Sequence, residues 1–204
     1  METGVLDTGA DQLVKVHEAG LDGAYRSLVQ RPRFDERYVP LAFPGGDVPA
    51  DQTGRADVVV RALREAGYDL QQLVNEDIKA DLARAAGTSG AGAAASAYPL
   101  QAKWHQAEPD ASIDHRRVPN LFVYLQRHAY PQTLVVRGRV DDWWPGDIVV
   151  FAVGGEGPDH IGIVSDRLGR GGVPRVIEAS PGLGVTQTHS LLAWPVVGHF
   201  RIAQ

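Results

Sequence analysis

Two short segments of the chain carry side chains whose types and positions suit chemistry. Trp144–Phe151 is a tight turn that leads into an apolar strand. In Asp159–Asp166, His160 opens a strand whose residues face alternate sides. Gly162 lies on the same face as His160 and leaves space beside the imidazole for a ligand or a neighbouring chain. His160 is therefore a candidate base, and the alternative is a hydrogen-bonded structural histidine.

A strand-borne histidine beside a helix N-terminus is a common arrangement for nucleophilic catalysis. The helix end lowers the pKa of the nucleophile, and the histidine accepts its proton. Asp51–Val59 is the segment expected to supply that helix start. The chain contains no cysteine, which excludes disulfides, thiolate metal sites, iron–sulfur clusters and a thiol nucleophile.

The elements that must position these residues change character near Gln132. Before it, apolar residues at helical spacing and capping signals predict helices over residues 10–30, Thr53 to Ala66, Asn75 to Ala86 and Asp114 to Ala129. After it, β-branched runs between turns predict antiparallel strands at Leu134–Val140, Ile148–Val153, Ile161–Ser165, Val176–Ala179 and Val196–Ile202. Asn75 is the expected N-cap of the third helix, and Gly87–Ala97 is an expected surface loop. Helices followed by strands predict an α+β fold.

Composition restricts the class of protein. The chain has 204 residues, of which 44% are hydrophobic and 22% charged, as in soluble globular domains. The net charge of −5, without a basic stripe, argues against nucleic-acid binding. No apolar run approaches the roughly 20 residues of a membrane span, and Met1-Glu2-Thr3 does not begin a signal peptide. No cofactor or metal is predicted, because the histidines lack zinc-site spacing.

Five segments, in order along the chain, resemble an uncharacterised bacterial family, the domain of unknown function 1287. They are Tyr38–Ala66 (with PGGDVPAD and ADVVVRALREAG), IDHRRVPNL at Ile113–Leu121, PGDIVVF at Pro145–Phe151, HIGIVSD at His160–Asp166 and GHFRI at Gly198–Ile202. That family is similar to the papain-like, NlpC-type cell-wall peptidases and amidases. The resemblance implies a papain-like α+β domain over residues 35–204, after a helix and connector at 1–34 in one compact unit. It also implies an extracytoplasmic location, periplasmic or secreted.

The resemblance also assigns positions to the catalytic groups. In such enzymes a cysteine at a helix start attacks a peptide bond of the peptidoglycan stem, a histidine is the base, and a polar residue on the next strand orients it. The histidine corresponds to His160, the cysteine position to Arg55, and the orienting position falls near Ala179 or Ser180. A guanidinium has no nucleophilic lone pair, so the thiol chemistry of such enzymes is lost here.

Arg55 needs an anionic partner, because a cation at a helix N-terminus opposes the helix dipole by roughly 0.3–1 kcal/mol. Asp51, Asp57 and Glu178 are the acids considered, and the simplest alternative is an exposed arginine paired with Asp57. A peptide carboxylate is another possible partner, since both the arginine fork and helix N–H groups favour anions. The former catalytic cleft is therefore predicted to bind carboxylates.

The DHRR run and the tryptophan pair could each serve either a functional or a structural purpose. Asp114 and Arg116 lie in a run, DHRR, that could bind a metal or phosphate, but a capped helix start is favoured. Trp144, next to Trp143, could stack on a sugar, but core and rim packing is favoured.

Three functions remain open from the sequence. The first, which we expect, is a non-catalytic relative of a peptidoglycan peptidase that binds stem peptides or a protein partner in its former active-site cleft. The second is a cell-wall hydrolase in which His160 activates water, assisted by Glu178 or Asp57. The third is a deliberately inactivated form of an active cysteine peptidase. Binding without turnover would distinguish the first from the second.

Overall fold

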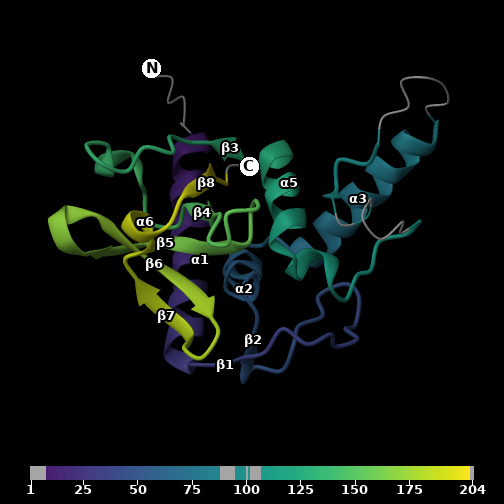
Figure 1. The fold of residues 1–204 in the computed structure, drawn as a ribbon, viewed down its shortest axis with the longest axis horizontal. Helices are drawn as coiled ribbons and strands as arrows, with labels where there is room; N and C mark the ends of the chain where they lie inside the picture. Colours follow the sequence, from purple (N-terminus) through teal and green to yellow (C-terminus); the bar gives the residue numbers. More distant parts are fainter. Residues whose placement is uncertain (1–7, 88–94, 100, 102–106, 203–204) are drawn as a thin grey trace, which may run out of the picture.

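The computed structural model describes residues 8–87, 95–99, 101 and 107–202 (Figure 1). The helices are α1 (Thr8–Gln30), α2 (Asp57–Glu65), α3 (Leu70–Gly87), α5 (Val118–His128) and α6 (Ser190–Ala193), with 3₁₀ turns η1 (Asp114–Arg116), η2 (Val140–Asp142) and η3 (Arg170–Gly172). The strands are β1 (Arg33–Phe34), β2 (Gln52–Thr53), β3 (Tyr130–Pro131), β4 (Ile148–Phe151), β5 (His160–Leu168), β6 (Pro174–Ser180), β7 (Gly184–Thr188) and β8 (Val196–Arg201).

Strands β3 to β8 form one six-stranded sheet in the order β3-β8-β4-β5-β6-β7, and every neighbouring pair is antiparallel. The short strands β1 and β2 pair separately and in parallel. Most helical residues precede the large sheet along the chain, as Figure 1 shows by colour. The predicted α+β class with an antiparallel sheet is confirmed.

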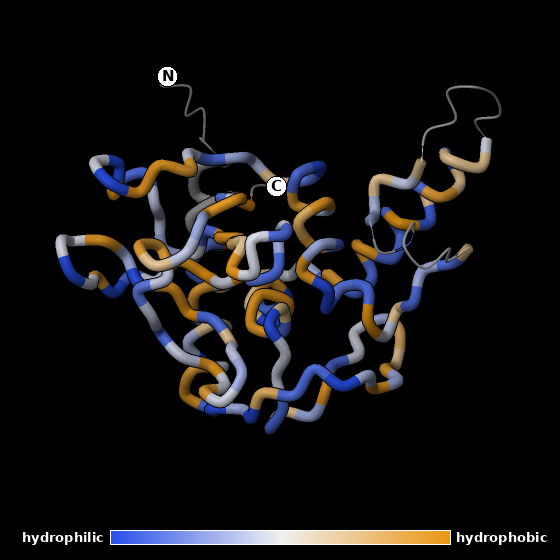
Figure 2. Tube along the Cα trace, viewed as in Figure 1, coloured by the Kyte–Doolittle hydropathy of each residue, from blue (hydrophilic) through white to orange (hydrophobic). Residues whose placement is uncertain are grey.

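The sheet has two apolar faces, and α2 lies against one of them. The first face carries Ile148, Val150, Ile161, Ile163, Ile177 and Ala179 in one cluster with the apolar residues of α2. The second carries Val149, Phe151, Val164 and Val176, which pack with Trp143 and Leu191. Figure 2 shows hydrophobic segments gathered at the centre, around α2. Because α2 packs against α1 and against β5 and β6, close packing holds this helix in place.

Two helix predictions need correction. Helix α3 begins at Leu70 rather than Asn75, because Asp69 accepts the backbone N–H of Gln71 at 3.1 Å and so caps the helix earlier. Asn75 is buried inside α3. The predicted helix over 114–129 is divided at Arg117, whose backbone is extended, because Pro119 fits only the first turn of a helix. Of the predicted loop at 87–97, residues 88–94 lie outside the described part.

The two-residue strands β1, β2 and β3 were not predicted, and among the longer segments the strand predictions fail at two places. Leu134–Val140 is a loop, interrupted by Gly138 at φ +76°, and its valines 136 and 140 pack against Trp143 beside the second face of the sheet. Strand β7 was not predicted, because it is a short edge strand with the polar pattern VTQT. The other four predicted strands are present with shifted ends.

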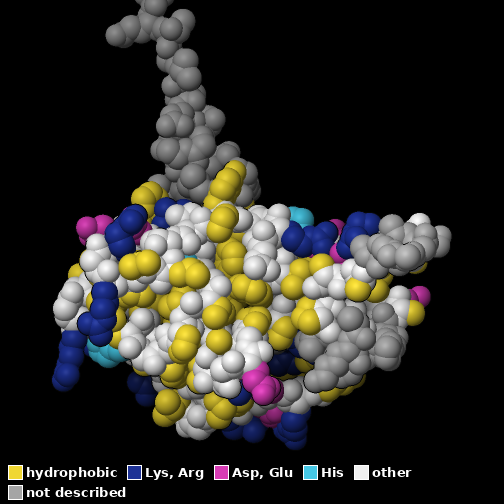
Figure 3. Space-filling model, turned by 45° about the horizontal axis from the view of Figure 1, so that its top comes forward, with side chains coloured by type: hydrophobic (Ala, Val, Ile, Leu, Met, Phe, Trp, Pro, Cys, Tyr) yellow, Lys and Arg dark blue, Asp and Glu magenta, His cyan; other side chains and the backbone are white. Residues whose placement is uncertain are grey.

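The surface is mixed in character. Among the described residues, no helix combines the length and the apolar character that crossing a membrane requires. Figure 3 shows one face, on which a band of hydrophobic side chains crosses the centre and Lys and Arg side chains lie toward the margins.

Candidate functional site

Arg55 lies immediately before α2, and an unexpected acid pairs with it. Parallel pairing of β1 with β2 aligns Phe34 with Thr53, so the residues that follow, Glu36 and Arg55, run side by side. The Glu36 carboxylate forms an ion pair with the Arg55 guanidinium and accepts the Arg55 backbone N–H at 3.2 Å. Among the described contacts, the expected partners Asp51, Asp57 and Glu178 do not pair with Arg55. Glu36 was not predicted as the partner, because it lies 19 residues upstream, outside the helix whose spacing was considered.

Asp57 is buried and pairs with Arg116 instead of Arg55. Its two carboxylate oxygens accept Nε and Nη2 of Arg116 at 2.8 and 2.9 Å, and one of them also accepts the backbone N–H of Gly54. Burial disfavours a charged Arg116, but the hydrogen bonds to Asp57 outweigh burial and raise its pKa. This pair joins η1 to the start of α2 across 59 residues.

Two backbone N–H groups just before α2 are therefore already occupied. Glu36 takes the N–H of Arg55, and Asp57 takes the N–H of Gly54. The prediction that helix N–H groups would themselves receive a ligand carboxylate is wrong for these two groups, because the chain supplies its own carboxylates.

His160 is held by Glu178 from the neighbouring strand. Its Nε2 lies 3.2 Å from Oε2 of Glu178, which is completely buried. The other oxygen of Glu178 accepts the hydroxyls of Thr188 and Ser190 at 2.6 and 2.8 Å. A carboxylate only accepts, so Nε2 is the donor and Nδ1 is the basic nitrogen of a neutral His160.

The residue that hydrogen-bonds the His160 ring is thus Glu178, which directly precedes the predicted Ala179 and Ser180. Ala179 faces the core on the other side of the sheet. Ser180 lies on the same face as Glu178, two residues further along β6. The space beside Gly162 is filled by β6: a Cβ there would lie 2.5 Å from Val176 and 2.8 Å from the carbonyl of Ile177. That glycine allows two strands to pack closely and does not make a ligand pocket.

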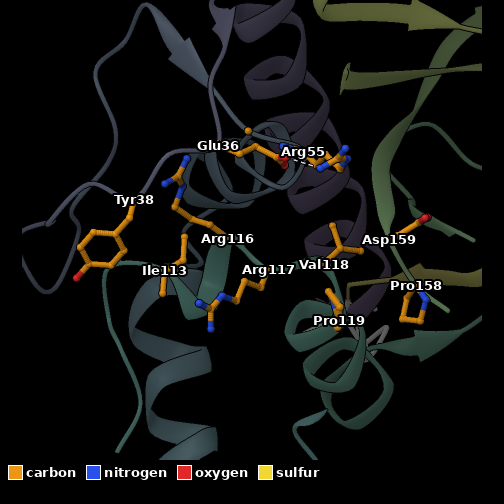
Figure 4. A pocket seen from close by; sticks show the side chains of 11 residues that line it. Glu36, Tyr38, Arg55, Ile113, Arg116, Arg117, Val118, Pro119, Pro158 and Asp159 are labelled. Atoms are coloured by element: carbon orange, nitrogen blue, oxygen red, sulfur yellow. Dashed lines mark hydrogen bonds and ion pairs between the residues drawn. The ribbon is translucent and has the colours of Figure 1, made fainter. Parts of the chain in front are cut away.

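Two adjoining cavities meet at Arg55 and Asp159, and we call them together the cleft. The His160 side, about 470 Å³, is lined by Arg55, Val153, Gly154, Asp159, His160, Ser180, Pro181 and Trp194. The Arg116 side, about 450 Å³, is lined by Glu36, Tyr38, Gly54, Arg55, Ile113, Arg116, Arg117, Val118, Pro119, Pro158 and Asp159 (Figure 4). Figure 4 shows Glu36 and Arg55 joined across the top of the second cavity. The cleft therefore presents an imidazole at one end and guanidinium groups at the other.

Two other predicted site residues, Asp114 and Trp144, do not line the cleft. Asp114 is buried, and its carboxylate accepts Gln101 and the Asp110 N–H, both at 2.7 Å, while burial raises its pKa. Trp144 is half-exposed, stacks with Arg201 and lines neither cavity, whereas Trp143 is buried. Asp114 caps neither η1 nor α5, so the favoured capped helix start is wrong; its carboxylate instead ties η1 to Gln101 and Asp110. The expected core packing of Trp143 and rim position of Trp144 agree with their burial. In the described part of the chain, no three His, Asp or Glu side chains gather as metal ligands.

Sequence reasoning missed several residues of the cleft. Glu36, Tyr38 and Arg117 come from loops and a helix start that meet only in the folded chain. Asp159 could have been found, because it directly precedes His160; its carboxylate accepts the N–H groups of Val153 and Gly154 at 2.7 and 2.6 Å. Trp194 contacts the imidazole edge-on at 4.9 Å between ring centroids.

His115, next to Arg116, makes the protein sensitive to mild acid. Burial lowers its pKa from 6.5 to about 4, so the unfolded chain binds a proton that the folded chain does not. Stability is therefore lost as pH falls from 6.5 toward 4, by about 2 kcal/mol between pH 7 and pH 5. Urea unfolding of wild type and His115→Gln at both pH values checks this. An equal pH dependence in the two proteins would contradict it.

Comparison with known proteins places most of the chain in one family. Residues 21–202 match the domain of unknown function DUF1287. The chain is 39% identical over 180 residues to the uncharacterised protein YijF of Escherichia coli strain K12, covering 88% of this chain and 78% of that protein. No solved structure matches.

Proposed function

This chain belongs to the DUF1287 family, and we propose that its cleft binds a carboxylate-bearing cell-wall stem peptide without cleaving it. The observation that supports this most directly is the place of Arg55. It precedes α2 and shares a cavity with His160, where the resemblance to NlpC-type enzymes expects a catalytic cysteine. On this proposal the fold is a papain-like one whose nucleophile has been replaced, and the protein works outside the cytoplasm.

Loss of peptide cleavage follows from the chemistry at the helix start. Hydrolysis through an acyl-enzyme requires a side chain that can attack a carbonyl carbon. Arg55 stays protonated at any working pH and cannot do so. The two nearby N–H groups that could polarise a carbonyl are bonded to Glu36 and Asp57.

Binding of a carboxylate follows from the electrostatics of Arg55. About a third of its side chain is exposed, and so is a similar share of Glu36. An ion pair this exposed is worth about 0–1 kcal/mol, so a ligand carboxylate can replace Glu36 at low cost. The Phe34 ring, 5.6 Å from the guanidinium, keeps Arg55 directed over the cleft.

Incubation of purified muropeptides with the protein, followed by mass spectrometry, is expected to show intact muropeptides. Calorimetry is expected to show binding of a synthetic stem peptide, L-Ala-γ-D-Glu-meso-diaminopimelate. Arg55→Ala should weaken that binding about tenfold, because a charge-assisted hydrogen bond is lost. Arg26→Ala is the control, since Arg26 forms a similarly exposed pair with Glu65 away from the cleft. Absence of binding by the wild type would refute the proposal.

Glu36→Gln should strengthen binding of the same peptide by about three- to fivefold. The substitution removes the internal carboxylate that competes for Arg55, and the expected gain corresponds to an exposed ion pair of about 0.5–1 kcal/mol. Glu65→Gln, which opens the matched pair Arg26–Glu65, should leave the affinity unchanged. Weaker binding by Glu36→Gln would mean that Glu36 positions Arg55 instead of competing with the ligand.

One observation favours a second candidate, hydrolysis by water that His160 activates. The buried Glu178 holds Nε2 of His160, which leaves Nδ1 as a base in a residue that lines the cleft. This candidate predicts new fragments in the mass spectrum that resist thiol reagents and disappear in His160→Ala. Intact muropeptides would exclude it for that substrate.

A further inference from the structure

Arg116 has hydrogen-bonding capacity that the folded chain does not use. Its side chain is only 4% exposed, and Asp57 occupies Nε and Nη2 on one edge of the guanidinium. Nη1 is buried and has no hydrogen-bond partner among the described residues. A buried donor without a partner costs free energy comparable to a lost hydrogen bond, so such a group indicates a missing acceptor.

The free edge belongs to a residue that lines the cleft. Figure 4 shows Arg116 reaching up from η1 toward Glu36, along the wall of its cavity. Gly54 leaves room beside the guanidinium, because a Cβ on Gly54 would lie 3.2 Å from Cγ of Glu36 and 3.4 Å from Nη2 of Arg116. Arg117 lines the same cavity, and its guanidinium pairs with Asp114 at 3.3 Å. Two positive charges therefore lie at this end of the cleft.

The acids of this cavity are already engaged. Glu36 pairs with Arg55, and Asp159 accepts two backbone N–H groups. The apolar part of the wall is made by Ile113, Val118, Pro119 and Pro158, and Tyr38 and Gly54 complete the lining. No described residue supplies an acceptor for Nη1 of Arg116, and the wall suits a short aliphatic arm beside it.

We propose that the Arg116 side of the cleft is a subsite for one carboxylate carried on a short aliphatic arm, with the carboxylate bound to Nη1 and Nη2 of Arg116. The proposal rests on the proposed function and refines it: the ligand is a peptide with at least two carboxylates, one near Arg55 and one on Arg116. A guanidinium can bind two carboxylates at once, one on each edge, whereas an ammonium cannot match that geometry.

The test uses the stem tripeptide and three derivatives, each with one carboxylate converted to the amide. Affinities are measured by calorimetry for the wild type and for Arg116→Lys, which keeps a positive charge for Asp57 but loses the second edge. One amide is expected to bind the wild type about 10- to 100-fold more weakly and to show no such penalty in Arg116→Lys. Arg61→Lys is the matched control, because Arg61 is also nearly buried and bidentate on an aspartate, Asp47, outside the cleft.

A second measurement does not depend on the stem peptide. Arg116 Nε–H resonances are recorded on ¹⁵N-labelled protein, assigned by their loss in Arg116→Lys, and followed during titration with propionate. A saturable shift is expected, and Gly54→Ala should abolish it because the added methyl occupies the space beside Nη2. Thermal unfolding of each variant verifies that it is folded.

The outcomes separate the two proposals. Equal affinity for all peptides, or an amide penalty that persists in Arg116→Lys, overturns the subsite while leaving stem-peptide binding intact. Absence of peptide binding refutes the proposed function, and a propionate shift that Gly54→Ala removes would still support the subsite. Absence of both peptide binding and a propionate shift overturns both.

Discussion

Asp147→Asn is expected to lower the free energy of unfolding by about 3–5 kcal/mol, because it removes the buried anion that holds Arg201 and His199. Asp147 is completely buried. Its oxygens accept Arg201 at 2.8 and 2.7 Å and Nε2 of His199 at 2.8 Å. The second nitrogen of His199 lies 2.8 Å from the carbonyl oxygen of Thr133, so the ring is held at both nitrogens. Arg201, which is largely buried, would therefore lose its counter-charge, and His199 would lose its charged partner.

Chemical denaturation at pH 7 measures this effect. Asp142→Asn is the control, because its side chain pairs with Arg139 at the surface, and it should change stability by less than about 0.5 kcal/mol. Burial raises the pKa of Asp147, but the hydrogen bonds from Arg201 and His199 outweigh burial and leave the pKa below its usual value. This stabilisation is thus present above about pH 4 and is lost as pH falls further. A loss under 1 kcal/mol in Asp147→Asn would show that the cluster tolerates an uncompensated charge.

Asp57→Asn is expected to cost a similar amount, about 3–5 kcal/mol, for a reason tied to the cleft. It leaves Arg116 buried without a full counter-charge and weakens the bond to the Gly54 N–H. Because that N–H lies at the entrance to α2, the position of Arg55 should be disturbed as well. Equilibrium unfolding gives the stability, and stem-peptide affinity gives the effect on the cleft.

A double variant separates the charge effect from simple loss of contacts. In Asp57→Asn with Arg116→Met both charges are removed, so much of the stability lost in the single variant should return. If the two substitutions instead destabilise additively, the pair contributes through packing and not through mutual neutralisation.

Local patterns predicted those parts of the fold that depend on neighbouring residues in the chain. Helices α1 and α2 and strands β4, β5, β6 and β8 follow from apolar spacing, because one buried face repeats at 3.6 or 2 residues. The segment 134–140 resisted the same reasoning: Val136 is buried under a turn and not in a ladder, and Val135 is exposed. The edge strand β7 resisted it because a polar edge strand leaves no apolar alternation to detect.

By itself the sequence determined that no thiol is present, that Arg55 stands at a helix start and that His160 opens a strand. Only the tertiary structure decided what each of them touches. Glu36 reaches Arg55 through parallel pairing of β1 with β2, Glu178 reaches His160 through the register of β5 with β6, and Asp57 holds Arg116 across 59 residues. Such partners are set by strand register and helix packing, which bring distant residues together and leave no local period in the sequence.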